Sequence, residues 1–132
     1  MIDIGLLLIR LVIGLLFIGH GTQKLFGWFG GYGLKGTGDW MDSLGLKPGM
    51  TMALLAGLTE LIGGILLVLG LLTPLAGLMI AATMVMAIVK VHGPNGLWST
   101  QNGYEYNLTL LAVAIGIALI GPGQYALDAF LF

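Results

Sequence analysis

A small set of ionisable and polar side chains in this chain could do chemistry, and they lie within or next to long apolar runs. They are Arg10, His20, Gln23, Lys24, Glu60, Lys90, His92, Glu105 and Asn107. A charged side chain at the centre of a membrane-spanning helix costs ~2.5–3.5 kcal/mol on insertion scales, so each such residue needs a partner or a purpose. These residues therefore mark the candidate site.

Glu60 is the deepest acid of the set, about nine residues or ~13 Å along its apolar run. One interpretation is a buried ion pair with Arg10 or with Lys24, which neutralises two costly charges. The other is an acid that exchanges protons or anchors a ligand, as buried carboxylates at functional sites do. Both interpretations can hold together.

The two histidines, His20 and His92, lie at similar depth and are open to three interpretations. They could pack and form hydrogen bonds at the interface, or they could bind the polar head of a ligand and carry protons. Their depth would also permit a bis-histidine haem or metal site. Two histidines without a companion motif are weak evidence for such a site, so haem is not the expected cofactor and no metal site is predicted.

Composition indicates the environment of these residues. Of the 132 residues, 58% are hydrophobic and 8% are charged, whereas a soluble domain has about 25% charged residues. The chain is therefore expected to be an integral membrane protein. A net charge of -1 with five scattered lysines and arginines gives no basic surface for nucleic acid. The absence of cysteine excludes disulfides and thiolate metal sites.

Four apolar runs, at about 4–24, 51–72, 74–92 and 104–121, predict four transmembrane helices in one domain covering 1–132. The expected fold is an all-α, four-helix membrane bundle. Thr73-Pro74 should end one span and open the next, because proline suits only the first turn of a helix. The stretch from Phe26 to Gly49 is rich in glycine and aromatic residues and is expected to be an interfacial segment.

The expected helices gather most of the polar residues at one end of the bundle. Arg10, Gly14, Phe17, Gly21 and Lys24 fall on one stripe of the first helix, which should face the other helices. The ends that carry His20, Lys90 and Glu105 lie on the same side of the membrane, and Glu60 enters from that side. The result should be a polar pocket that opens towards one membrane face.

Small residues and lysines add two further predictions. The pairs Gly77 and Ala81, and Ala112 and Gly116, are four residues apart and favour close helix contacts. The lysines lie on the side of the first and third loops, so the positive-inside rule puts both termini outside the cytoplasm. They are Lys24, Lys35, Lys47 and Lys90.

Five segments resemble the DoxX family of membrane proteins, in the order in which that family has them. They are GHGTQKLFG (Gly19 to Gly27), LGLKPG (Leu44 to Gly49), GLTELIGGILLVLGLLTPLAGL (Gly57 to Leu78), HGPNGLW (His92 to Trp98) and NGYEYNLTLL (Asn102 to Leu111). The resemblance implies a four-helix protein of the bacterial cytoplasmic, or inner, membrane. Such proteins are described as candidate oxidoreductases or as relatives of a quinol oxidase or thiosulfate:quinone oxidoreductase subunit. Some are associated with responses to catechols and quinones, or with a complex that detoxifies radicals.

The leading hypothesis is a site for a quinone, a quinol or a related phenolic compound, in an oxidoreductase subunit with a role in quinone or oxidative stress defence. An apolar ligand whose head needs donors, acceptors and proton carriers would suit the predicted pocket. The catalytic candidates are Glu60, His20, His92 and Glu105. The ligand-binding candidates are Arg10, Lys24, Gln23, Lys90, Trp28 and Asn107.

Electrons would have to come from elsewhere, because the sequence has no recognisable flavin, iron–sulfur or copper motif. The expected partners are the lipid bilayer, the quinone or aromatic ligand, a redox partner protein and further copies of the chain. Two other hypotheses stay open. One is a membrane scaffold or assembly partner without enzymatic activity, and the other is a transporter of small aromatic compounds.

Overall fold

The computed structural model describes residues 1–131, and these residues form helices and loops without a β-strand. The α-helices are α1 (Ile2–Phe26), α2 (Gly33–Ser43), α3 (Gly49–Leu69), α4 (Thr73–Ala87), α5 (Glu105–Ile120) and α6 (Leu127–Leu131). Short 3-10 turns occur at η1 (Trp28–Gly30), η3 (Gly93–Asn95) and η4 (Ser99–Gln101), and α4 continues into a π-helical turn, η2 (Ile88–His92). The expected all-helical class is confirmed.

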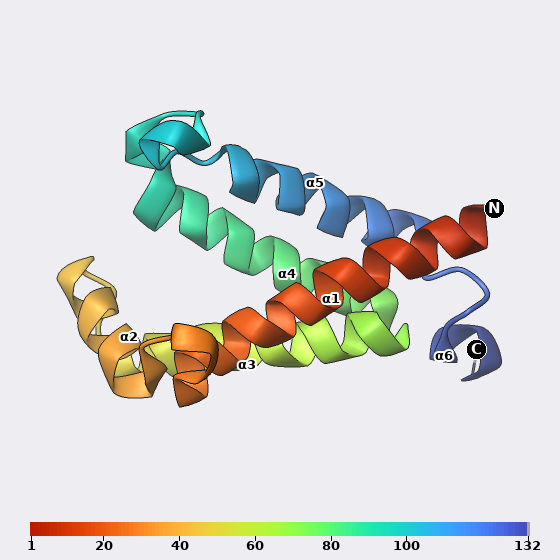
Figure 1. Ribbon diagram of the computed structural model, residues 1–132, viewed down its shortest axis with the longest axis horizontal. Helices are drawn as coiled ribbons and strands as arrows, with labels where there is room; N and C mark the ends of the chain where they lie inside the picture. The colour runs from red at the N-terminus through yellow and green to blue at the C-terminus, as the bar shows by residue number, and fades with distance from the viewer. Residues whose placement is uncertain (132) are drawn as a thin grey trace.

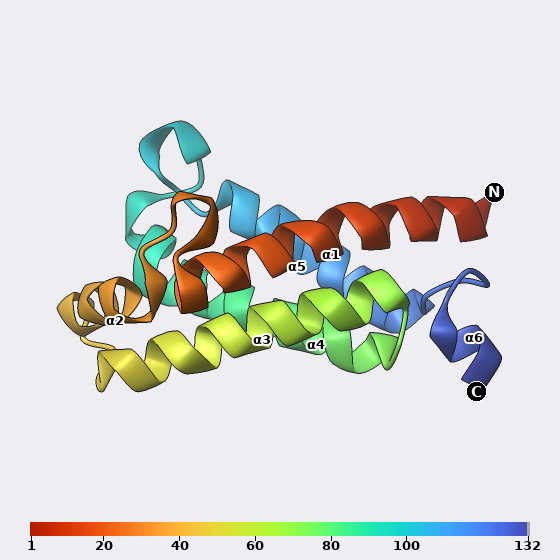
Figure 2. The ribbon, with the colours of Figure 1, turned by 60° about the horizontal axis from the view of Figure 1, so that its bottom comes forward.

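The four long helices α1, α3, α4 and α5 lie side by side and alternate in direction (Figures 1 and 2). One end of the bundle, called the loop end here, carries α2 and the turns between α4 and α5. The other, terminal end carries the N-terminus and α6. α1 packs mainly along α3, and α5 packs along α4.

Within residues 1–131, three helical segments are apolar and long enough to cross a membrane: Ile2–Phe26, Gly49–Leu69 and Thr73–Asn95. α5 is also apolar but has only 16 residues, which extend ~24 Å against a hydrocarbon core of ~30 Å. The chain is therefore a multi-pass membrane protein. Three of the four expected spans have full membrane-spanning length.

The helix ends follow from local sequence. α1 ends at Gly27 and α3 at Gly70, where φ values of 76° and 67° place both glycines in the left-handed region. α4 starts at Thr73 with Pro74 in its first turn, as the Thr73-Pro74 break predicts.

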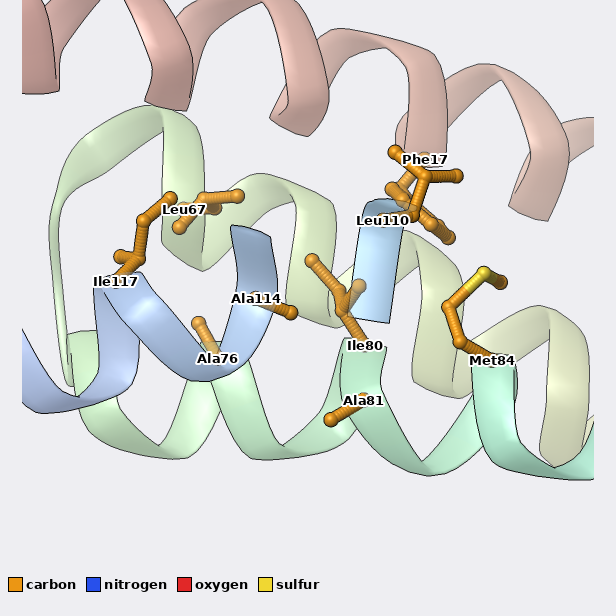
Figure 3. Packing of buried hydrophobic residues seen from close by; sticks show 9 residues of the cluster. All are labelled: Phe17, Leu67, Ala76, Ile80, Ala81, Met84, Leu110, Ala114 and Ile117. Atoms are coloured by element: carbon orange, nitrogen blue, oxygen red, sulfur yellow. The ribbon is translucent and has the colours of Figure 1, made fainter. Parts of the chain in front are cut away.

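The core lies between the four long helices, where side chains from all of them meet (Figure 3). Its buried members are Phe17, Leu67, Ala76, Ile80, Ala81, Met84, Leu110, Ala114 and Ile117. α4 and α5 approach closely at Gly77, where a Cβ atom would lie 2.6 Å from the carbonyl oxygen of Ala114. The predicted contact through Ala112 and Gly116 is wrong. Ala112 is exposed, and nothing lies within 4 Å of a Cβ built on Gly116.

The interfacial segment after α1 contains a helix, α2, that the sequence analysis did not predict. α2 packs on the start of α3, and a Cβ atom at Gly38 would lie 3.1 Å from backbone atoms of Met50. Glycine is a poor helix former, so the composition of this stretch argues against a helix. Packing against α3 overrides that local preference.

Candidate functional site

An ion pair between α1 and α3 lies at the centre of the candidate site. Lys24 Nζ is 2.9 Å from Glu60 Oε2, and the two side chains are 24% and 7% exposed. Both residues lie one helical turn after a close contact of the two backbones, because a Cβ atom at Gly21 would lie 2.8 Å from the carbonyl oxygen of Gly57. Because α1 and α3 are antiparallel, the two residues lie one turn to either side of that contact. The close approach of the helices lets the long lysine side chain reach the carboxylate.

A cavity of about 440 Å³ lies beside this ion pair. Such a volume is within the range of small-molecule pockets, ~300–1,000 Å³. Most of its wall is apolar or aromatic and comes from α1 to α5 and the stretch after α2. These residues are Phe17, Trp40, Met41, Leu44, Leu46, Met52, Leu55, Ala56, Ala82, Met84, Met86, Ala87, Val91, Tyr106 and Leu110.

The polar part of the cavity wall combines side chains from α1, α3, α4, η2 and α5. They are His20, Lys24, Thr59, Glu60, Thr83, Lys90, His92 and Asn107. His20 is half-buried and meets Phe17 edge to face, with ring centroids 5.9 Å apart. Nδ1 of His92 is 3.0 Å from the carbonyl oxygen of Asn102, so its Nε2 is the ring nitrogen available to a ligand. Six of the ten predicted site residues thus line one cavity.

Asn107 is the most unusual polar residue of this wall. Its side chain is buried, with 7% exposed. Its Nδ2 has no hydrogen-bond partner among the described residues. A buried donor without an acceptor costs ~1–3 kcal/mol. The amide is therefore a donor that a bound ligand could satisfy.

The rim of the cavity includes side chains that are exposed on the outside of the bundle. Leu55 of α3 and Met86 of α4 both line it and are 54% and 51% exposed. Trp40 of α2 and Tyr106 of α5 are rim residues too, at 41% and 53% exposed. α3 and α4 diverge towards the loop end (Figure 1), which is where these residues lie. An apolar ligand could enter from the bilayer.

Arg10 does not belong to this cavity. Of the two partners considered for Glu60, the structure pairs it with Lys24 and not with Arg10. The Arg10 guanidinium is fully buried near the terminal end and donates to the carbonyl oxygens of Leu67 at 3.3 Å, Val68 at 3.4 Å and Tyr125 at 2.5 Å. α1 and α3 are antiparallel, so Arg10 lies opposite the last turn of α3. That turn is seven to eight residues, or ~12 Å, from Glu60.

Gln23, Trp28 and Glu105 also lie outside the cavity, contrary to the expectation of one shared pocket. Gln23 points into the first loop, where its Nε2 donates to the carbonyl oxygen of Phe29 at 3.3 Å. Trp28 is 56% exposed on η1 and stacks against Phe26 with ring centroids 5.2 Å apart. Glu105 accepts a hydrogen bond from Ser99 Oγ at 2.8 Å and holds the loop before α5. Local contacts in the two loops turn all three side chains away.

Part of the cavity wall comes from α2 and was not predicted from the sequence. Met41 is buried, and it lines the cavity together with Trp40, Leu44 and Leu46. The available signal was Gly38, which lets α2 approach the start of α3 closely. Among residues 1–131 no group of three or more His, Cys, Asp or Glu side chains is placed to hold a metal ion.

The chain is similar to known membrane proteins. The model of the DoxX family matches residues 5–93, which is more than half of the chain. The chain belongs to the DoxX family. The DoxX match runs from α1 to the first residue of η3 and includes Lys24, Glu60 and His92. Asn107 lies beyond it.

Several bacterial membrane proteins are similar over nearly the whole chain. "Putative oxidoreductase CatD" of Bacillus subtilis is 36% identical over 132 residues, which cover 98% of this chain and 89% of the relative. Inner membrane protein YphA of Escherichia coli is 32% identical over 93% of this chain and 87% of its own length. Inner membrane protein YqjF of Escherichia coli is 29% identical over 98% and 93%. No solved structure matches this DoxX chain.

Proposed function

We propose that the cavity binds the head of a quinone, a quinol or a related phenolic compound, and that the chain is the ligand-binding subunit of a membrane oxidoreductase. The observation that carries this proposal is the buried amide of Asn107, which lines the cavity. Its Nδ2 lacks an acceptor among residues 1–131. A carbonyl or hydroxyl oxygen on the ligand would supply that acceptor.

The chemistry of the wall suits the two parts of such a ligand. The ring would lie against apolar side chains such as Phe17, Met84 and Leu110, while its oxygens meet Asn107 and His20. An isoprenoid tail would leave the cavity past exposed Leu55 and towards the lipid. Free catechols and simple phenols need no exit for a tail and would fit the same head site.

Reduction of a quinone to a quinol takes up two electrons and two protons. The protein side chains that can handle the protons are Glu60, His20 and His92, which line the cavity. The electrons come from a redox partner protein that carries its own cofactor. The name of the Bacillus subtilis relative includes the word oxidoreductase, which supports this class of reaction. The proposal extends to a role in quinone or oxidative stress defence.

The proposed setting is the bacterial inner membrane, as the names of the two Escherichia coli relatives say of those proteins. α5 would be the fourth span, since it is apolar and packs along α4. Both termini would lie outside the cytoplasm, because the lysines gather at the loop end.

Quinone binding to the purified protein in lipid nanodiscs tests the proposal. Asn107→Leu keeps the size of the side chain but removes the amide, and Glu60→Gln removes the charge but keeps hydrogen bonding. Loss of one hydrogen bond of ~0.5–1.5 kcal/mol should weaken binding about threefold to tenfold in Asn107→Leu. Glu60→Gln should change the pH dependence of binding.

Glu105→Gln is the matched control, because Glu105 is the other glutamate of the chain and lies outside the cavity. It should bind quinone as the wild type does. A wild type that binds no quinone, together with an Asn107→Leu variant that only changes in stability, would overturn the proposal and favour a scaffold. Flux of an aromatic compound into vesicles would instead favour a transporter.

A further inference from the structure

A second hollow of about 310 Å³ lies at the loop end, next to the cavity. Lys24 and Trp40 line both spaces, so these two side chains form the wall between them. The rest of the second lining comes from the end of α1, the first loop and α2. It consists of Gln23, Gly30, Gly31, Tyr32 and Thr37.

We propose that this second hollow, called the vestibule here, is a water-filled proton passage from the membrane surface to Glu60, with Lys24 at its inner end. The inference rests on the proposed function, because a quinone site must exchange protons. The vestibule itself can be tested without any quinone.

Glu60 is isolated from the membrane surface and needs a route for protons. Its side chain is 7% exposed and lies eleven residues after Gly49, the start of α3, so bulk water does not reach it directly. The charged and titratable groups that share its cavity are Lys24 and His20 of α1, Lys90 and His92 beyond α4, and Tyr106 of α5. Lys24 alone among these also lines the vestibule.

The side chains that line the vestibule are suited to hold water. Gln23, Tyr32 and Thr37 offer neutral donors and acceptors, which suit water better than an ion. A space of this volume holds on the order of ten waters at ~30 Å³ each. Tyr32 lines the vestibule and is 79% exposed, so water can enter beside it.

Lys24 lies between the vestibule and Glu60. Its ammonium group contacts Glu60 at 2.9 Å while its side chain stays 24% exposed. An ammonium group has three donors on a flexible stem, so it can hydrogen-bond the carboxylate and a vestibule water together. A proton that moves along the waters reaches the Glu60 oxygen by forming one O–H bond and breaking another, with no redox step.

The cysteine-free sequence makes accessibility measurable in a natural background. Thr37→Cys would place a thiol in the vestibule, and Leu15→Cys would place one on the exposed apolar face of α1. A charged, water-soluble thiol reagent should label Thr37→Cys in proteoliposomes about tenfold faster or more, because the reactive thiolate needs water. Should Thr37→Cys fail to fold, Tyr32→Cys at the mouth takes its place.

Plugging the vestibule after folding then tests the passage. In a buffer acidic enough to protonate Glu60, infrared spectroscopy would follow hydrogen–deuterium exchange of its carboxyl proton, with Glu60→Gln assigning the band. Labelled Thr37→Cys should exchange several-fold more slowly, whereas labelled Ser43→Cys, exposed on α2 outside the vestibule, should exchange as the wild type does.

Two results would overturn the passage: labelling of Thr37→Cys and Tyr32→Cys no faster than of Leu15→Cys, or unchanged Glu60 exchange after labelling. Quinone binding is measured separately on the unlabelled protein. A chain that binds no quinone but passes both vestibule tests would lose the proposed function and keep the passage.

Discussion

The guanidinium of Arg10 in α1 donates a hydrogen bond to the carbonyl oxygen of Tyr125, at 2.5 Å and across 115 positions of sequence. The same group donates to the carbonyl oxygens of Leu67 and Val68 in the last turn of α3, where helix carbonyls run short of backbone partners. Arg10 therefore joins α1, α3 and the segment before α6 at the terminal end. Its role in this structure is to hold the fold, away from the cavity.

Replacing Arg10 should destabilise the protein without changing the cavity. Arg10→Met leaves three buried or half-buried carbonyl oxygens without this donor, and we expect a loss of about 2–4 kcal/mol. The measurement is the unfolding midpoint in a denaturing detergent titration. Lys35→Met, on the exposed surface of α2, should leave the midpoint unchanged. An unaltered midpoint in Arg10→Met would contradict the assignment.

The glycine contact that places the ion pair can be tested with two glycines of the same helix. Gly21→Ala would put a Cβ atom 2.7 Å from the backbone nitrogen of Leu61, and such overpacking costs ~1–3 kcal/mol. Gly19→Ala meets nothing within 4 Å and should be neutral or stabilising by up to ~1 kcal/mol. The midpoint of thermal unfolding, Tm, should therefore fall in Gly21→Ala, whereas in Gly19→Ala it should stay the same or rise. Equal shifts would argue against a tight α1–α3 contact at Gly21.

The coupling between Lys24 and Glu60 should be visible in a double-mutant cycle. The single change Lys24→Met leaves the buried Glu60 unpaired, and Glu60→Gln leaves the half-buried Lys24 unpaired. The double change removes both charges, so the coupling should be ~1–3 kcal/mol. Lys35 and Asp39, both exposed on α2, provide a control cycle with an expected coupling below ~0.5 kcal/mol. A coupling as small as the control would mean that the pair does not persist in the membrane.

Asp128 predicts a pH dependence at the terminal end. Burial alone would raise the pKa of this carboxyl group, but hydrogen bonds from the backbone of Thr73 and Leu72, together with the charge of Arg10, outweigh it and lower the pKa below 3.8. The folded pKa is thus below the unfolded one. The stabilising contribution is complete above about pH 4 and disappears as the pH falls through the folded value.

The free energy of unfolding of the wild type and of Asp128→Asn, measured as a function of pH, tests this pH dependence. The wild type should lose stability relative to Asp128→Asn as the pH falls below 3.8, and the difference between them should be greatest near neutral pH. Asp39→Asn, an exposed site on α2, serves as the control and should follow the wild type. Parallel profiles for the wild type and Asp128→Asn would contradict the capping role of Asp128 at α4.

The sequence by itself determined the class of protein and the faces of its helices. Apolar runs of membrane-spanning length leave a helix as the way to satisfy the backbone, so the long helices follow from composition. The stripe of Arg10, Gly14, Phe17 and Gly21 is buried as its helical spacing predicts, because one face of α1 must meet the bundle. Pro74 fixed the start of α4 for the equally local reason that proline fits only a first turn.

Only the tertiary structure decided which polar residues meet. Arg10 and Lys24 share a stripe, but the antiparallel packing of α1 on α3 puts Lys24 beside Glu60 and Arg10 beside the end of α3. Glu105 and Asn107 are two residues apart, yet the carboxylate turns to Ser99 and the amide lines the cavity. Spacing along one helix gives direction around its axis, whereas the partner depends on the register between helices. That register is set by close backbone contacts such as Gly21 on Gly57, which a single sequence does not pair.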